Sequence, residues 1–106
     1  MKALLLLAHG SRVESSNEAV AALVNSLRPK LEHHGFASIN YAFLELASPA
    51  IPEGIEALVK ENATQIVVLP YFLAPGTHVI DDIPQLIEAA KTDYPDVVFT
   101  VIKHLR

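Results

Sequence analysis

The sequence contains no cysteine and no long hydrophobic run. Without cysteine, a disulfide scaffold, a thiolate-bound metal and an iron–sulfur cluster are all excluded. The longest apolar run, Ala3 to Ala8, is far too short to cross a bilayer. Lys2 is the only charged residue before this run and no small-residue cleavage site follows it, so we do not expect a signal peptide. The sequence therefore predicts a cytoplasmic protein with no membrane partner.

Positive charge is also scarce. Eight Lys and Arg residues stand against twelve Asp and Glu, giving a net charge of −4, and the basic residues are scattered along the chain. Proteins that bind nucleic acid gather Lys and Arg into a stripe, with aromatic residues beside them where single strands are bound. Because neither pattern is present, we expect no nucleic-acid partner.

Several common catalytic motifs are missing as well. The sequence has no G-x-x-x-x-G-K-[ST], no G-x-G-x-x-G and no G-x-S-x-G. A triad of Ser11, His78 and Asp81 can be drawn, but nothing places Ser11 on a nucleophile elbow. Nucleotide binding and serine hydrolysis are therefore not favoured.

The residues that are present predict one globular domain over residues 1–106. About half of them, 51%, are hydrophobic, and 19% are charged. Short continuous apolar runs are typical of strands covered on both faces, as in a parallel sheet. Four such runs predict strands over Lys2–Ala8, Ile39–Leu44, Gln65–Leu69 and Val97–Ile102.

Between these runs, apolar residues recur at steps of three and four, which indicates helices. The helices are predicted over Glu14–His33, Ser48–Asn62 and Asp82–Thr92. Ser11 or Ser15 is expected to cap the first helix, and Ser48 the second, with the next proline in its first turn. Pro84 is expected in the first turn of the third helix, which leaves His78 in the preceding loop or in a separate leading turn.

The alternation of strands and helices predicts an α/β fold. We expect a small doubly wound parallel sheet of four strands, in the order 2-1-3-4, with helices on both faces. In that order the topology reverses between the first and third strands, and ligands bind beyond the carboxyl ends of the strands at such a reversal. His9 follows the first strand, Glu45 ends the second, and His78 lies past the third. These three side chains are expected at one edge of the sheet.

Two neutral imidazoles beside a carboxylate suit divalent Fe, Co, Ni or Zn. The loop after the third strand favours such a site, because it is long and carries the apolar residues Tyr71 to Ala74. Simpler interpretations stay open at this point. His9 could cap a turn, and Glu45 could assist the start of the second helix.

The sequence ends soon after the fourth predicted strand, with Lys103–Arg106. No helix-forming segment follows to cover that side of the sheet. An incompletely covered apolar sheet is marginally stable alone, so we expect a partner, most simply a second copy of the chain.

Three stretches, LLLAHGSR, AFLELASPAIPEGI and VVLPYFLAPGTHVIDDIP, together resemble the CbiX/SirB-type sirohydrochlorin chelatases. These are class II chelatases related to ferrochelatase, and the resemblance covers nearly the whole chain. It implies insertion of Co²⁺ or Fe²⁺, and in some members Ni²⁺, into sirohydrochlorin in cobalamin or siroheme biosynthesis. No cofactor is implied beyond that substrate metal.

The resemblance also implies roles for particular residues. The two metal-site histidines of the family fall on His9 and His78, and an acidic position of related chelatases falls on Glu45. The flat ring is expected to meet an apolar wall made by Tyr71, Phe72 and Leu73. Its peripheral carboxylates are expected to meet Ser11, Arg12, Ser48 and Thr77.

The short members of the family resemble half of a two-lobed ferrochelatase, and the resemblance implies a homodimer with the cleft between subunits. Family members usually continue past the fourth strand into a further helical segment, whereas this sequence stops at Arg106. Two other functions stay open. One is a non-catalytic dimer that binds a metal or tetrapyrrole through His9 and His78, and the other is an inert interaction domain.

Overall fold

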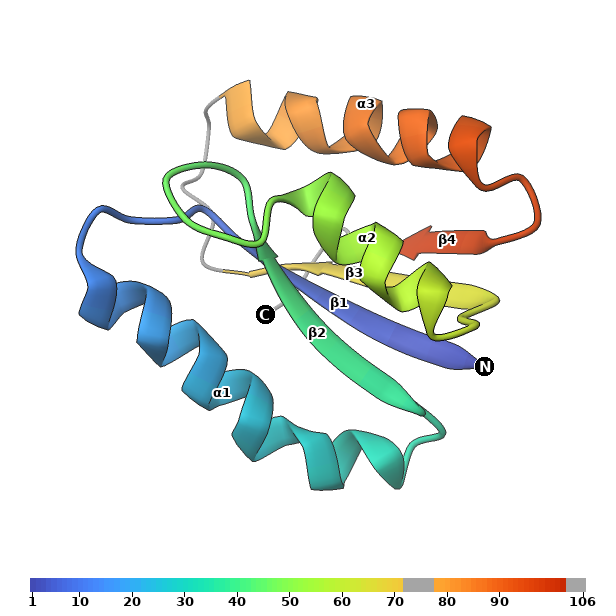
Figure 1. Cartoon of the computed structure of the whole chain (residues 1–106), viewed down its shortest axis with the longest axis horizontal. Coiled ribbons are helices and arrows are strands. Elements are labelled where there is room, and N and C mark those ends of the chain that lie inside the picture. Colours follow the sequence, from blue (N-terminus) through green and yellow to red (C-terminus); the bar gives the residue numbers. More distant parts are fainter. Residues whose placement is uncertain (72–77, 103–106) are drawn as a thin grey trace.

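The computed structural model describes residues 1–71 and 78–102, with side chains described for residues 1–71 and 83–102. Strands and helices alternate along this part of the chain (Figure 1). The strands are β1 (Lys2–Ala8), β2 (Ser38–Phe43), β3 (Gln65–Pro70) and β4 (Val98–Val101). The helices are α1 (Glu14–Glu32), α2 (Ile51–Lys60) and α3 (His78–Asp93).

The strands form one parallel sheet in the order β2-β1-β3-β4. Helix α1 covers one face, and α2 and α3 lie on the other (Figure 1). The predicted α/β fold class, the parallel sheet and the 2-1-3-4 order are therefore confirmed. The predicted ends of β2, β3 and β4 were each wrong by about one residue, as is usual where a strand frays into a loop.

The central strand β1 explains why its apolar run is continuous rather than alternating. Successive side chains of a strand point to opposite faces. Ala3, Leu5 and Leu7 belong to the core cluster shared with α2 and α3, whereas Leu4, Leu6 and Ala8 belong to the cluster shared with α1. Burying each leucine contributes about 1.5–3 kcal/mol relative to leaving it exposed, so this strand anchors both halves of the core.

Each helix contributes the apolar stripe that its spacing predicts. Helix α1 buries Val20 and Val24, with Leu23, Leu27 and Leu31 packed partly buried against the same cluster. On the opposite face, the buried helical side chains are Ile51, Ile55 and Leu58 from α2 and Ile83, Ile87 and Ala90 from α3. The strands whose carboxyl ends carry the predicted site are thus packed between two core clusters, one on each face of the sheet.

The predicted cap of α1 is wrong. The residue at the cap position is Val13, and no side chain makes the capping hydrogen bond. Instead, the Ser11 hydroxyl accepts a hydrogen bond from the backbone N–H of Val13 at 3.0 Å, which closes a tight local turn before the helix. Neither Ser11 nor Ser15 therefore caps α1, because the backbone after Gly10 is committed to that turn.

The predicted start of α2 is also wrong. The helix begins at Ile51 with Ala50 at the cap position and Pro52 in its first turn, so Ser48 is not its cap. Ser48 and Pro49, joined by a cis peptide bond, lie in the preceding loop. The sequence offers two prolines three residues apart, and either could occupy a first turn.

Helix α3 begins at His78, four residues before the predicted start, and Pro84 lies in its interior. The prediction that placed His78 in a loop or a separate turn, and Pro84 in the first turn, is wrong. An interior proline removes one hydrogen bond and costs about 3 kcal/mol. Burial of Ile83, Ile87 and Ala90 against the sheet offsets that cost.

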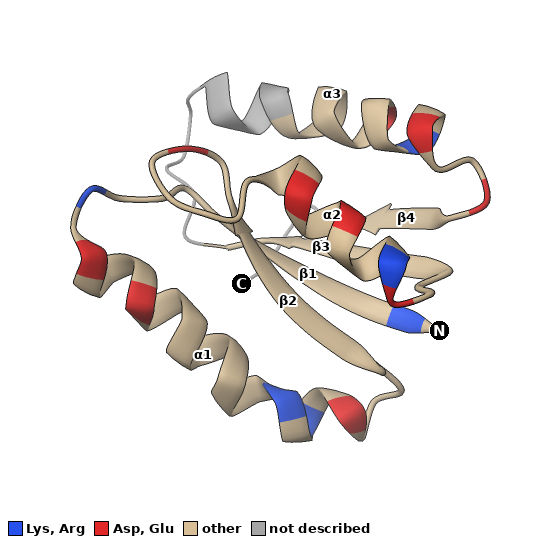
Figure 2. Ribbon diagram, viewed as in Figure 1, with Lys and Arg blue, Asp and Glu red and all other residues tan. Residues whose placement is uncertain are grey.

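Among the described residues, no helix combines the length and the apolar character needed to cross a membrane. Figure 2 shows Lys and Arg at separate places along the described ribbon, interspersed with Asp and Glu. The predicted absence of a nucleic-acid partner stays a prediction.

Candidate metal centre at the carboxyl edge of the sheet

The ring of His9 and the carboxylate of Glu45 meet just beyond the ends of β1 and β2. His9 Nε2 lies 3.0 Å from Glu45 Oε1. The two side chains come from different crossover loops, 36 positions apart in the sequence. Both stay open to solvent, with 34% of the His9 side chain and 56% of the Glu45 side chain exposed. The pair therefore forms a small polar site that an ion can reach.

Backbone contacts bring the two loops together before any side chain does. The β1–β2 ladder continues past the strands, because the N–H of Leu44 donates to Ala8 O at 2.9 Å and that of Glu45 donates to His9 O at 3.1 Å. Gly10 makes this approach possible. A Cβ atom there would clash with the carbonyl oxygen of Glu45, and its φ of +97° suits glycine.

The loop that follows His9 is fixed from the side of α1 by Asn17. The Asn17 amide donates to Ser11 O at 2.8 Å and accepts from the N–H of Ser11 at 3.0 Å. One side chain thus satisfies both backbone groups of one loop residue. Sequence reasoning missed Asn17, because an asparagine in a first helical turn has no distinctive pattern.

The two nitrogens of His9 have different surroundings. Nδ1 is buried and has no hydrogen-bond partner among the described residues, whereas Nε2 is the nitrogen beside Glu45. An ionised carboxylate can only accept hydrogen bonds, so Nε2 must carry a hydrogen in this arrangement. An ion arriving from solvent would therefore meet Nε2 and the Glu45 carboxylate together.

Glu45 is not part of a helix start, since it lies six residues before Ile51, where α2 begins. That interpretation is wrong, and the contact with His9 replaces it. Strand β2 ends at Phe43, so Glu45 lies in the loop just beyond the strand rather than at its end. The prediction that His9 and Glu45 share one edge of the sheet is confirmed by their contact.

Only some of the other predicted residues have described side chains. His78 begins α3, but its side chain lies outside the described part of the chain, as do Phe72, Leu73 and Thr77. Tyr71 is half-buried and packs against the α1-side core. Among residues with described side chains, no group of three or more His, Cys, Asp or Glu is close enough to hold a metal ion. The described part of the site is thus the His9–Glu45 pair.

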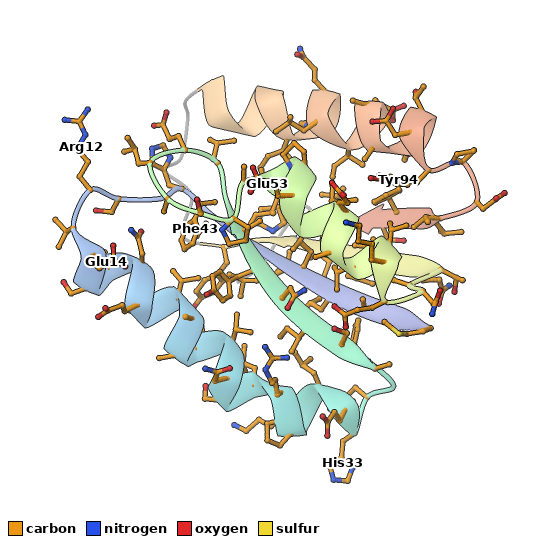
Figure 3. All side chains as sticks on the ribbon, in the orientation of Figure 1. Arg12, Glu14, His33, Phe43, Glu53 and Tyr94 are labelled. Atoms are coloured by element: carbon orange, nitrogen blue, oxygen red, sulfur yellow. The ribbon has the colours of Figure 1, made fainter. Side chains whose placement is uncertain are left out.

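Two predicted carboxylate-binding residues are exposed, and their role stays a prediction. Arg12 is exposed and points outward from the loop between β1 and α1 (Figure 3). Ser48 is exposed in the loop before α2. His33 lies at the far end of α1 from Arg12, remote from the site (Figure 3).

Comparison with known proteins places the chain in a family. The sequence model of the CbiX family matches residues 3–105. The chain belongs to the CbiX family. Among curated relatives of this CbiX chain, the sirohydrochlorin cobaltochelatase of Methanocaldococcus jannaschii is 34% identical over 87 residues. The sirohydrochlorin ferrochelatase of Priestia megaterium is 35% identical over 97 residues.

The match covers most of the CbiX chain but only part of each relative. It spans 82% of this chain and 59% of the Methanocaldococcus protein, and 92% of this chain and 35% of the Priestia protein. The sirohydrochlorin chelatase SirB of Bacillus subtilis subspecies spizizenii, solved in complex with cobalt, superposes with a TM-score of 0.83 at 35% identity. That superposition covers 96% of this chain and 42% of SirB.

Proposed function

We propose that this chain acts as a sirohydrochlorin chelatase, which inserts a divalent metal, Co²⁺, Fe²⁺ or Ni²⁺, into the macrocycle. The observation that carries the proposal is the solvent-accessible His9–Glu45 pair at the carboxyl edge of a parallel sheet. The names of its relatives and the cobalt in the SirB structure supply the substrate class.

The reaction is an exchange of one metal ion for two protons, with no change of oxidation state. The divalent ion replaces the hydrogens of two pyrrole nitrogens, and both protons must leave the ring. Such an enzyme must hold the ion loosely enough to release it, which an open site of few ligands permits and a closed four-ligand site does not. Two accessible side chains, one imidazole and one carboxylate, fit that requirement.

We assign the described residues roles in this exchange. Nε2 of His9 receives the ion as the donor atom of a neutral imidazole, so the ring hydrogen that faces Glu45 leaves Nε2 and Nδ1 takes up a hydrogen in its place. Glu45, at hydrogen-bond distance, offers negative charge to the ion and an acceptor for a proton. His78 is proposed as the second imidazole ligand, since it begins the helix that follows β3, the strand beside β1.

The remaining substrate contacts are also proposals. Tyr71, Phe72 and Leu73 would face the ring, and Ser11, Arg12, Ser48 and Thr77 would meet its carboxylates. The reaction as written needs no nucleotide and no resident cofactor. We propose that it takes place in the cytoplasm.

The function is tested by anaerobic mixing of the chain with sirohydrochlorin and Co²⁺, Fe²⁺ or Ni²⁺, in separate reactions. The absorption spectrum is followed against a control without protein. We expect the spectrum of the metallated ring to develop faster than in the control with at least one ion. Binding of the ring or the metal without acceleration would instead indicate a carrier, and binding of neither would indicate an inert interaction domain.

Replacing Glu45 with glutamine is expected to slow metal insertion on the order of 10-fold or more. Glutamine keeps an oxygen that can accept from His9 Nε2, but it removes the charge and the proton acceptor. Because the Glu45 side chain is more than half exposed, the melting temperature should hardly change. The measurement is the initial insertion rate at a fixed concentration of Co²⁺.

Glu56→Gln is a matched control, because it removes one carboxylate from an exposed pair with Lys60 on α2. It should leave the insertion rate unaltered. Equal rates for Glu45→Gln and the unmodified chain would rule out a role for the Glu45 charge.

We also propose that the chain forms a homodimer. Strand β4 is an edge strand in the described sheet, and its Val98 side chain is 56% exposed. Unpaired edges with exposed apolar residues favour association. Multi-angle light scattering at micromolar concentration should report twice the mass of the chain. A monomer at that concentration would contradict this proposal and leave the chemistry at His9 untouched.

A further inference from the structure

Leu46, the residue after Glu45, has an unusual combination of backbone conformation and exposure. Its φ is +65°, in the left-handed region, and the residue is 52% exposed. A leucine pays a steric penalty in that region, which glycine and asparagine largely avoid. A single exposed leucine is ordinary on a protein surface, but an exposed leucine held in a strained conformation is not.

The same chain shows the ordinary solution elsewhere. After α2 the backbone again enters the left-handed region, at Asn62 with a φ of +71°. Asparagine tolerates this conformation and is common there. At Leu46 the chain instead places a large apolar side chain in solvent, where it gains little from the core. The strain is then understandable if the side chain contacts a ligand.

The position of Leu46 is fixed by its neighbours. The N–H of Glu45 is bonded to His9 O at 3.1 Å, immediately before Leu46. The loop is closed again when the N–H of Phe43 donates to Pro49 O at 2.8 Å. Figure 1 shows this loop between β2 and α2 beside the loop that leaves β1. Leu46 is therefore held one residue from the His9–Glu45 pair by a backbone anchored at both ends.

We propose that Leu46 is a substrate-contact residue that packs against the apolar face of the macrocycle whose metal is inserted at His9. This rests on the proposed function, since it takes the ligand to be a flat tetrapyrrole. A ring brought to the metal pair would lie beside the loop that carries Leu46, and we place its face against the exposed part of that residue. Removal of that apolar surface from water would favour ring binding.

The test uses Leu46→Ala, Leu46→Gly and Leu46→Met. The Kd for metal-free sirohydrochlorin is measured by absorption titration, and the Kd for Co²⁺ by competition with a coloured chelator. Alanine and glycine remove the same contact surface, so both should weaken ring binding about 10-fold, as expected for half a leucine. Methionine keeps the apolar area and should bind the ring within about twofold of the unmodified chain. Co²⁺ affinity should be unaltered in all three.

Stability separates this role from a structural one. At a φ of +65° glycine is less strained than alanine, so Leu46→Gly should melt about 5 °C above Leu46→Ala. Ring affinity should nevertheless be equally low in both. His33→Ala is the control, because His33 is exposed and lies at the far end of α1, remote from the site (Figure 3).

Four results would overturn the proposal: unaltered ring binding in Leu46→Ala, an equal loss in His33→Ala, a parallel loss of Co²⁺ affinity, or ring affinity that follows melting temperature. An unmodified chain that does not bind sirohydrochlorin would overturn the proposed function together with this inference. An active chain whose Leu46 variants bind normally would overturn this inference alone.

Discussion

Replacing either His9 or His78 with alanine is expected to abolish most metal insertion, on the order of 100-fold or more, and replacing both is expected to add little. If the two imidazoles hold one ion, removing either leaves a site that no longer delivers it. Residues that act as one unit are strongly non-additive in this way. Initial rates of sirohydrochlorin metallation by the two single variants and the double variant measure the effect.

The fold should survive the change at His9. Its side chain is 34% exposed and projects from a loop beyond β1, so His9→Ala should shift the melting temperature by only a few degrees. His33→Ala is a suitable control, since His33 is an exposed histidine at the far end of α1 (Figure 3). Near-normal insertion by a folded His78→Ala protein would defeat the assignment of His78, and the same result for His9→Ala would defeat the site itself.

Gly10→Ala is expected to be the most destabilising single substitution near the site. A Cβ atom at this position would clash with the backbone carbonyl of Glu45, and the φ of +97° is unfavourable for alanine. The backbone penalty is about 1–2 kcal/mol, and forced displacement of a neighbouring backbone adds roughly 1–3 kcal/mol. The melting temperature should fall by roughly 10 °C or more, and insertion should fall too, because the displaced segment carries Glu45.

Gly35→Ala separates the two contributions. Gly35 has a comparable φ of +88°, but a Cβ atom there would meet nothing within 4 Å. This variant should therefore show only the backbone penalty, about 5 °C in melting temperature, with insertion unaltered. Equal destabilisation by the two substitutions would mean that the close approach of the two loops at Gly10 is unimportant.

Periodicity along the sequence was enough to predict the fold. Strands covered on both faces are continuously apolar, and Lys2–Ala8 is the central strand that this pattern requires. Alternation of elements and the rules for parallel crossovers leave few strand orders, and the order expected for a small sheet of this kind, 2-1-3-4, is the one observed. Sequence patterns predicted the starts of the helices less well than the fold. Ser11 and Ser48 were plausible caps by residue type, but their conformations depend on loop contacts that residue types do not reveal.

The start of α3 shows a similar conflict between local and tertiary effects. The position of Pro84 predicted a helix that begins near Asp82, yet the helix begins at His78. The local cost of a proline is set by the residue itself, whereas the offsetting burial of Ile83 and Ile87 depends on the sheet beneath them.

By itself the sequence determined the parallel sheet, its two core faces and the placement of His9 and Glu45 at one edge, because strand topology brings carboxyl ends together whatever their separation in the chain. Only the tertiary structure decided that the two side chains touch, at 3.0 Å, and that Asn17 holds the loop after His9. It also decided that Gly10 must lack a side chain and that Leu46 stays exposed in a strained conformation. These features depend on how closely two loops approach each other. That distance is set by the packing of α1 and α2 on opposite faces of the sheet, so no local pattern of residues predicts it.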